Sequence, residues 1–197
     1  MKTGGMGWYE RFKGEDATDP ASGWNKVITF NSKGGNLEGT VYGKKVENFR
    51  TDWSKVESIY KDISLDDRRK CYKDWEGLLR EDPQYKEVKV VERHPNGEVK
   101  VFYLKVGLGM FMTDRTVLVE TNNTFHEDGT WTTVMQSTQH PDYPENDEAI
   151  RVSTFTVTDS SATADGKGSI MTEYSNSDGM GWVPPSLMNM TMGTTTK

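Results

Sequence analysis

The residue types that most often perform chemistry are sparse in this chain and lie far apart. Three histidines, His94, His126 and His140, stand in turn or loop sequence, where solvent exposure is the expected state. None of them has the spacing of a metal site, and Cys71 alone can neither anchor zinc nor form an intrachain disulfide. The nucleophile-elbow, phosphate-loop and zinc-peptidase motifs are absent from the sequence. The sequence therefore predicts no catalytic residue, no metal site and no cofactor.

One group of carboxylates has the composition of a calcium site: Asp142, Glu145, Asp147 and Glu148. Its spacing does not match an EF-hand loop, and Pro141 and Pro144 indicate a solvated connection between strands instead. Paired catalytic carboxylates cannot be picked out, because Asp and Glu are scattered along the chain. We therefore expect a protein that is not an enzyme.

The composition restricts the classes of partner. The chain has 197 residues, a formal net charge of −6 and 34% hydrophobic residues. Nucleic acid is an unsuitable partner for such a chain, because phosphate binding needs a basic face. No apolar run reaches the ~20 residues that a membrane-spanning helix needs, and residues 1–11 contain no signal-peptide core. Together with the single cysteine, these features predict a cytoplasmic protein whose membrane contact is transient.

The elements that would position a binding site are best defined around Asn96-Gly97. Five apolar residues alternate with polar ones on either side of this turn: Val88, Val90, Val99, Val101 and Tyr103. Such period-2 alternation around Asn-Gly predicts a β-hairpin. An apolar loop and a further strand follow it directly. Long antiparallel strands joined in this way form a curved sheet whose inner face must be covered, which suggests a hydrophobic ligand.

The order of the elements predicts an α+β fold with one antiparallel sheet. Strands are expected near residues 24–30, 37–44, 46–52, 85–94, 97–107, 115–122, 130–138, 149–159 and 168–175. Capping-box matches at Ser54 and Ser64 predict two helix starts, and Pro83 ends the second helix. Residues 1–23 are expected to form a leader and linker. Residues 24–197 are expected to form the domain, with a closing helix after Pro185.

The expected strand at 149–159 has two mixed faces. Ile150, Val152, Thr154 and Thr156 share one face; Arg151, Ser153, Phe155 and Val157 share the other. A strand over a dry core should have one continuously apolar face. Either this strand lines a cavity for an amphiphile, with Arg151 placed for a head group, or it exposes a long polar edge.

The order of several short motifs resembles that of the START lipid-transfer domain, the family named after the steroidogenic acute regulatory protein. The resemblance spans about residues 24–190. Its motifs are Trp24-Asn25-Lys26-Val27, Cys71-Tyr72-Lys73-Asp74-Trp75, Val101-Phe102-Tyr103, Met112-Thr113-Asp114-Arg115, Ile150-Arg151 and Asp178-Gly179-Met180-Gly181-Trp182-Val183-Pro184.

This resemblance implies a helix-grip fold, in which a curved antiparallel sheet of about nine strands wraps around a C-terminal helix. It also implies non-enzymatic binding, and intermembrane transfer, of one lipid of the sterol, phospholipid, ceramide or fatty-acid class. The expected lipid contacts are Val101, Tyr103, Phe155 and Val157 from strands, Met110 and Phe111 from a gate loop, Met188 and Met192 from the lid, and Arg115 and Arg151 at the head group.

Two features depart from the family pattern. Thr116 stands where the family has an acidic partner for the arginine, which puts a buried ion pair there in doubt. The expected closing helix is short or truncated, and Gly193 and the threonines after it would fray it.

Two other functions remain open. An incomplete lid would expose apolar surface for protein partners, so the domain could serve as a scaffold subunit of a cytoskeletal or membrane assembly. A hydrolase or cyclase on the related pollen-allergen-like grip fold would need a histidine or carboxylate inside the cavity, and none of the histidines is expected within a strand.

Overall fold

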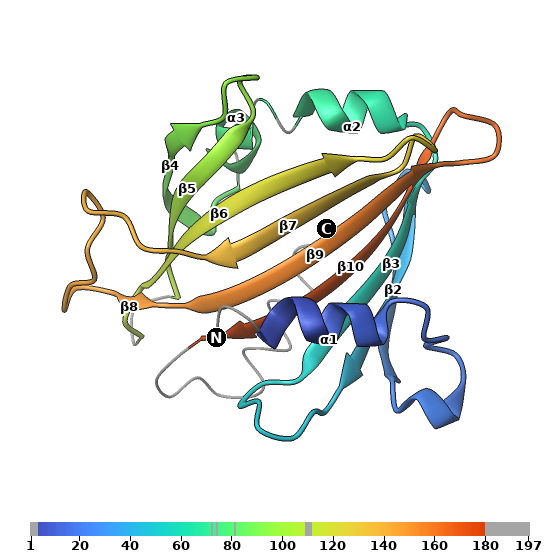
Figure 1. Cartoon of the computed structure of the whole chain (residues 1–197), viewed down its shortest axis with the longest axis horizontal. Helices are drawn as coiled ribbons and strands as arrows, with labels where there is room; N and C mark the ends of the chain where they lie inside the picture. Colours follow the sequence, from blue (N-terminus) through green and yellow to red (C-terminus); the bar gives the residue numbers. More distant parts are fainter. Residues whose placement is uncertain (1–3, 72, 74, 81, 109–111, 180–197) are drawn as a thin grey trace.

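The computed structural model describes residues 4–71, 73, 75–80, 82–108 and 112–179 (Figure 1). Its helices are α1 (Gly4–Phe12), α2 (Leu65–Cys71) and α3 (Trp75–Arg80), with a 3-10 turn at Pro20–Ser22. The strands are β1 (Asn25–Asn31), β2 (Leu37–Lys44), β3 (Trp53–Tyr60), β4 (Tyr85–Arg93), β5 (Val99–Val106), β6 (Arg115–Phe125), β7 (Trp131–Ser137), β8 (Ile150–Arg151), β9 (Ser153–Ala162) and β10 (Ser169–Asp178). None of the helices in the described ranges has the length and apolar character needed to cross a membrane.

All of these strands belong to one curved sheet (Figure 1). Its order is β1-β2-β3-β10-β9-β7-β6-β5-β4, with every neighbouring pair on this path antiparallel, and the two-residue β8 pairs with β6 in parallel. The edge strands are therefore β1 and β4. Register shifts interrupt both of them, once in β1 and three times in β4. The predicted antiparallel sheet of about nine strands is confirmed.

The hairpin predicted around Asn96-Gly97 is formed by β4 and β5. Gly97 has a φ of +84°, a left-handed conformation that glycine adopts without steric cost. The Asn96 side chain accepts a hydrogen bond from the Glu98 backbone N–H at 3.1 Å, which closes the turn. Local turn chemistry therefore fixes the register of this pair of strands.

The helices lie on opposite faces of the sheet. Successive residues of a strand point to opposite faces, and directly paired residues of neighbouring strands share a face. Along this register, Trp53, Tyr174 and Val157 point to the side of α1, which we call the α1 face. Met171 and Phe125 point the other way and contact Arg68 and Arg69 of α2. We call this second side the α2–α3 face.

An aromatic cluster fills the α1 face. Phe12 and Trp53 are fully buried, and their ring centroids lie 5.4 Å apart. Trp24 packs edge-on to Phe12 at 5.4 Å, and Phe155 packs on Trp53 at 6.1 Å. The hydroxyl of Tyr9 donates a hydrogen bond to Asp159 of β9 at 2.8 Å. These contacts attach α1 to the centre of the sheet.

Three sequence-based predictions in this region are wrong. Residues 46–52, expected as a strand, form the connection between β2 and β3 instead. Ser54 does not cap a helix: it lies in β3, where Trp53 and Lys55 point to the α1 face and Val56 and Ser58 to the other. Strand alternation and pairing on both sides outweigh the local capping pattern. The single helix expected after Ser64 is instead divided into α2 and α3, although Ser64 does cap α2 by accepting the Asp67 N–H at 3.1 Å. The closing helix expected after Pro185 lies outside the described residues.

Residues 1–23, expected as leader and linker, include α1 and its buried Phe12. If α1 is part of the folded unit, Phe12→Ala will lower the free energy of unfolding by about 3–5 kcal/mol, the usual cost of removing a buried aromatic side chain. Denaturant titration measures this change, with Lys13→Ala, an exposed neighbour, as control. A loss below about 1 kcal/mol would show that the domain begins after residue 23.

Candidate functional site

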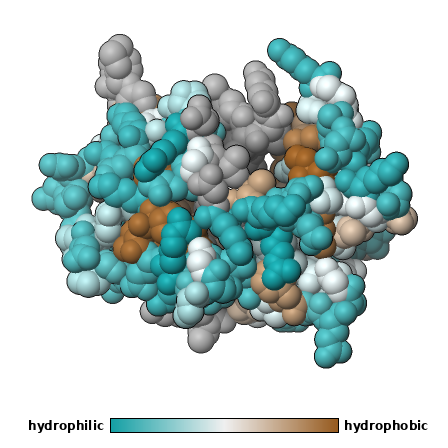
Figure 2. Space-filling view, turned by 90° about the horizontal axis from the view of Figure 1, so that it is seen from above, coloured by the Kyte–Doolittle hydropathy of each residue, from teal (hydrophilic) through white to brown (hydrophobic). Residues whose placement is uncertain are grey.

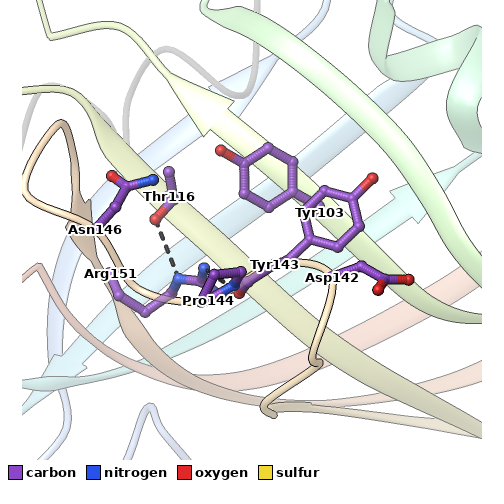
Figure 3. Close-up of a pocket in the computed structure, with 7 residues that line it drawn as sticks. All are labelled: Tyr103, Thr116, Asp142, Tyr143, Pro144, Asn146 and Arg151. Carbon is purple, nitrogen blue, oxygen red and sulfur yellow. Dashed lines mark hydrogen bonds between the residues drawn. The ribbon is translucent and has the colours of Figure 1, made fainter.

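One pocket lies on the α1 face where β5 and β6 meet the connection between β7 and β8 (Figure 3). It encloses about 120 Å³ and is lined by Tyr103, Thr116, Asp142, Tyr143, Pro144, Asn146 and Arg151. The rings of Tyr103 and Tyr143 lie 4.9 Å apart between their centroids. Desolvation raises the pKa of the Tyr103 hydroxyl, so this group stays a neutral hydrogen-bonding group at physiological pH.

Thr116, which stands where the family resemblance implied an acidic residue, has a hydrogen-bond partner in this pocket. Arg151 Nε donates to the Thr116 hydroxyl at 3.1 Å, the bond drawn in Figure 3, and Nη2 donates to the Tyr143 carbonyl at 3.0 Å. Thr116 is therefore a partner of Arg151, and Arg151 fastens the β7–β8 connection to β6. Tyr103 and Arg151, which were both predicted from the sequence to lie at a binding site, line this pocket together.

Arg115 has a different environment. It is 6% exposed, and its Nε donates to the Gly179 carbonyl at 2.8 Å. A further hydrogen bond joins it to the Thr113 carbonyl. Burial lowers the pKa of the guanidinium. Arg115 thus ties the start of β6 to the segment that follows β10.

The other expected lipid contacts are placed as follows. Val157 is fully buried in the aromatic cluster, and Phe155 packs against that cluster. Val101 and Tyr103 share the α1 face with them by register. Whether these four residues contact a lipid stays a prediction. The remaining four, Met110, Phe111, Met188 and Met192, lie outside the described residues.

The α2–α3 face carries an apolar cluster at the β4–β6 end of the sheet. Phe102, Leu104 and Val119 are buried there, and Leu79 of α3 packs against them. Three half-buried residues extend the cluster: Val90, Val117 and Met135. Seen from the side of α2 and α3 (Figure 2), the surface is mainly hydrophilic, with hydrophobic residues gathered in separate patches.

Towards β9, β10 and β3 the same face becomes rich in hydroxyl groups. Register places on it the buried residues Thr133, Thr156, Thr158, Ser160 and Ser58. The α2–α3 face therefore changes from apolar to polar across the sheet, while the α1 face is filled with aromatic rings. A dry core would have shown one apolar character throughout.

Two ionisable side chains, those of Arg68 and Glu173, lie in this polar half. Arg68 of α2 stacks its guanidinium 4.4 Å from the centre of the Tyr60 ring and directs Nη2 to the Met171 sulfur at 3.1 Å. Glu173 is two residues after Met171 on β10 and points to the same face. Burial raises the pKa of Glu173 above its ordinary value of 4.5, and the hydrogen bond from Ser175 and the charge of Arg68 oppose this rise only in part.

The sequence did not lead to a prediction of Arg68 or Glu173 as candidate site residues. Arg68 precedes Cys71 by three residues and Trp75 by seven, which is the spacing of residues on one face of a helix. This spacing could have indicated that Arg68 lies on the face that packs against the sheet. Glu173 gave no signal, because nothing in the sequence indicates which face of β10 is enclosed. Of the three histidines, His126 is exposed as expected, whereas His94 and His140 are half-buried.

The raised pKa of Glu173 predicts a pH-dependent stability. A carboxyl whose folded pKa is raised favours folding fully below its unfolded value near 4.5, and this contribution is lost as pH rises through the folded pKa. Glu173→Gln removes the ionisation. We expect its melting temperature to match the wild type near pH 4 and to exceed it by a few degrees at pH 8, since about 1 kcal/mol corresponds to about 2–4 °C in a domain of this size.

Differential scanning calorimetry across this pH range tests the expectation, with Glu47→Gln, in an exposed turn, as control. A constant difference between wild type and Glu173→Gln at all pH values would contradict it.

Comparison with known proteins identifies the family. The model of the START domain matches residues 10–196. Human STARD10 has a similar structure, with a TM-score of 0.71 and 19% identity, covering 93% of this chain and 71% of that one. Human StAR-related lipid transfer protein 5 gives a TM-score of 0.69 and 12% identity, covering 97% and 86%.

A bacterial structure is similar as well. The StAR-related lipid transfer protein fragment from Xanthomonas axonopodis gives a TM-score of 0.65 and 17% identity, covering 86% of this chain and 90% of that one. No curated protein matches the sequence. Because the family model covers nearly the whole chain, this protein belongs to the START domain family.

Proposed function

We propose that this protein binds a single lipid molecule without chemical conversion and carries it between membranes, with the lipid lying along the α2–α3 face of the sheet. The observation that carries the proposal is the change from apolar to hydroxyl-rich side chains across this one face. Membership of the START family supports the choice of a lipid as ligand.

The polarity of the face matches that of an amphiphile. Phe102, Leu104 and Val119 offer an apolar surface for a hydrocarbon chain at the β4–β6 end. Thr158 of β9 and Ser58 of β3 lie at the other end, where a polar group would find hydrogen-bonding partners. A ligand with one apolar and one polar end would satisfy both halves at once.

The apolar half of the α2–α3 face also has exposed surface that a lipid chain could bury. Val117 and Met135 keep exposed surface at this face, and the covering helices α2 and α3 are only 7 and 6 residues long. Burial contributes about 0.8 kcal/mol per CH₂ group, so one acyl chain provides ample binding free energy. Met135 adds a flexible side chain that adapts to ligands of different shape.

The α1 face is a poorer host for a whole lipid. The aromatic rings around Phe12 and Trp53 already fill its centre. The pocket at Tyr103 and Arg151 encloses about 120 Å³, below the roughly 300 Å³ of the smallest usual ligand pockets. The expectation that Val101, Tyr103, Phe155 and Val157 contact lipid corresponds to this face and remains to be tested.

Two adjacent residues of β7 point to opposite faces of the sheet, so substitutions at them test the two faces separately. Met135 points to the α2–α3 face and Gln136 to the α1 face, and both are half-buried. We expect Met135→Trp to reduce the lipid bound per protein several-fold by occupying the apolar half, and Gln136→Trp to leave it unchanged. The measurement is native mass spectrometry of protein incubated with mixed-lipid vesicles, with melting temperatures to confirm folding.

The opposite result, loss with Gln136→Trp alone, would place the lipid on the α1 face. Wild-type protein that takes up no lipid, yet is recovered from cells with the same protein partners, would replace the proposal with the scaffold function.

A further inference from the structure

The guanidinium of Arg151 has more hydrogen-bond donors than its neighbours use. Nε donates to the Thr116 hydroxyl and Nη2 to the Tyr143 carbonyl, which leaves three of the five guanidinium N–H groups without an acceptor among the described residues. Within the same residues, no carboxylate lies within 4.0 Å of this guanidinium. Its positive charge is therefore not paired by the part of the chain that the structure describes.

Two further donors line the same pocket of about 120 Å³ (Figure 3). The Tyr103 hydroxyl makes no hydrogen bond to any described residue. Asn146 accepts the Glu148 backbone N–H through its side-chain oxygen at 3.1 Å, and its NH₂ group has no acceptor in the described ranges. The pocket therefore brings together N–H and O–H donors from three side chains: those of Arg151, Tyr103 and Asn146.

The lysines near the pocket already have acidic partners. Lys89 and Lys105 point to the α1 face, because they pair with Tyr103 and Thr116 across the sheet. Lys89 forms an ion pair with Glu87, and the Lys105 ammonium lies 3.9 Å from the Asp114 carboxylate. Arg151 is thus the cation at this pocket for which an incoming anion supplies the missing partner.

Asp142 also lines the pocket but does not take that place. Its side chain is 80% exposed, and in Figure 3 its carboxylate lies on the far side of Tyr143 from Arg151. The guanidinium side of the pocket therefore stays open to a ligand.

We propose that this pocket binds the carboxylate group of a short organic acid. The two carboxylate oxygens accept from free N–H groups of Arg151, because a guanidinium and a carboxylate share a planar, two-pronged geometry. The Tyr103 hydroxyl and the Asn146 amide donate to the same oxygens. The rings of Tyr103 and Tyr143, with centroids 4.9 Å apart, contact the apolar part of the acid. The site lies on the opposite face of the sheet from the proposed lipid and does not depend on it.

The size and charge of the pocket select a carboxylate among the common ligand groups. A volume of about 120 Å³ admits neither an acyl chain nor a nucleotide. A phosphate group carries up to about two negative charges at neutral pH, and one guanidinium offsets only one of them. A neutral amide would turn its own NH₂ donors towards the donors of the pocket. A group with one negative charge and two acceptor oxygens avoids both conflicts.

The test compares acids with their neutral amides, which have the same shape. Protein labelled with ¹⁵N is titrated in phosphate-free buffer with acetate, benzoate, acetamide or benzamide, and binding is followed by amide chemical shifts in NMR spectra. For at least one of the two acids, we expect an affinity about tenfold or more above that of its amide. The largest shifts should fall at residues 103, 116, 143–146 and 151.

Two substitutions test the roles of the donors. Arg151→Gln should lower the affinity for the acid to that for the amide. Tyr103→Phe keeps the ring and removes a hydroxyl that has no partner among the described residues, so it should weaken acid binding about threefold to tenfold without lowering the melting temperature. Arg11→Gln, at an exposed position of α1, is the matched control. If Arg151→Gln does not fold, Tyr103→Phe and the comparison of acid with amide still decide.

Equal affinity for acids and amides would overturn this inference, as would shifts that avoid the pocket. Inorganic phosphate that binds more tightly than either acid would also overturn it, because the pocket would then select charge and not the carboxylate group. None of these results changes the proposed function, which is tested separately by lipid uptake.

Discussion

The packing of Phe12 against Trp53 is the interaction on which the rest of the structure depends. An antiparallel sheet has two faces, and at least one must be packed against other elements, while the other can face water. Phe12 and Trp53, with Trp24 and Phe155, cover the α1 face by packing aromatic rings edge to face. With one face closed by this dense packing, the stability of the sheet does not require the other face to be apolar.

The α2–α3 face carries polar side chains that the stability of the sheet does not exclude. Side chains that a closed core would exclude, such as Thr158, Ser58 and Glu173, lie there under two short helices. A buried polar group without a hydrogen-bond partner, such as the Ser58 hydroxyl, lowers stability unless something binds it. These polar side chains share one face of the sheet with an apolar cluster, and this combination is more characteristic of a binding surface than of a core.

Local sequence patterns predicted the elements whose signals are local. The β4–β5 hairpin was predicted because Asn96-Gly97 fixes the turn and the flanking valines alternate. β3 was misassigned because the Ser54 capping pattern is local, whereas pairing with β2 and β10 is not. Prediction of the candidate site from sequence is limited in the same way, because local patterns do not report contacts between distant segments. Arg151 and Tyr103 were recognised by residue type, but the partners of Thr116 and the enclosed face of β10 depend on contacts between distant segments.

The register shifts in the edge strands affect how this sheet behaves towards other copies of itself. An open edge offers a row of unpaired backbone groups to any extended chain that approaches. The shift between Lys26 and Ile28 in β1, and those between Tyr85 and Arg93 in β4, break that row into short pieces. Another strand would find no continuous ladder to extend at either end. The irregular edges thus work against edge-to-edge aggregation of the domain.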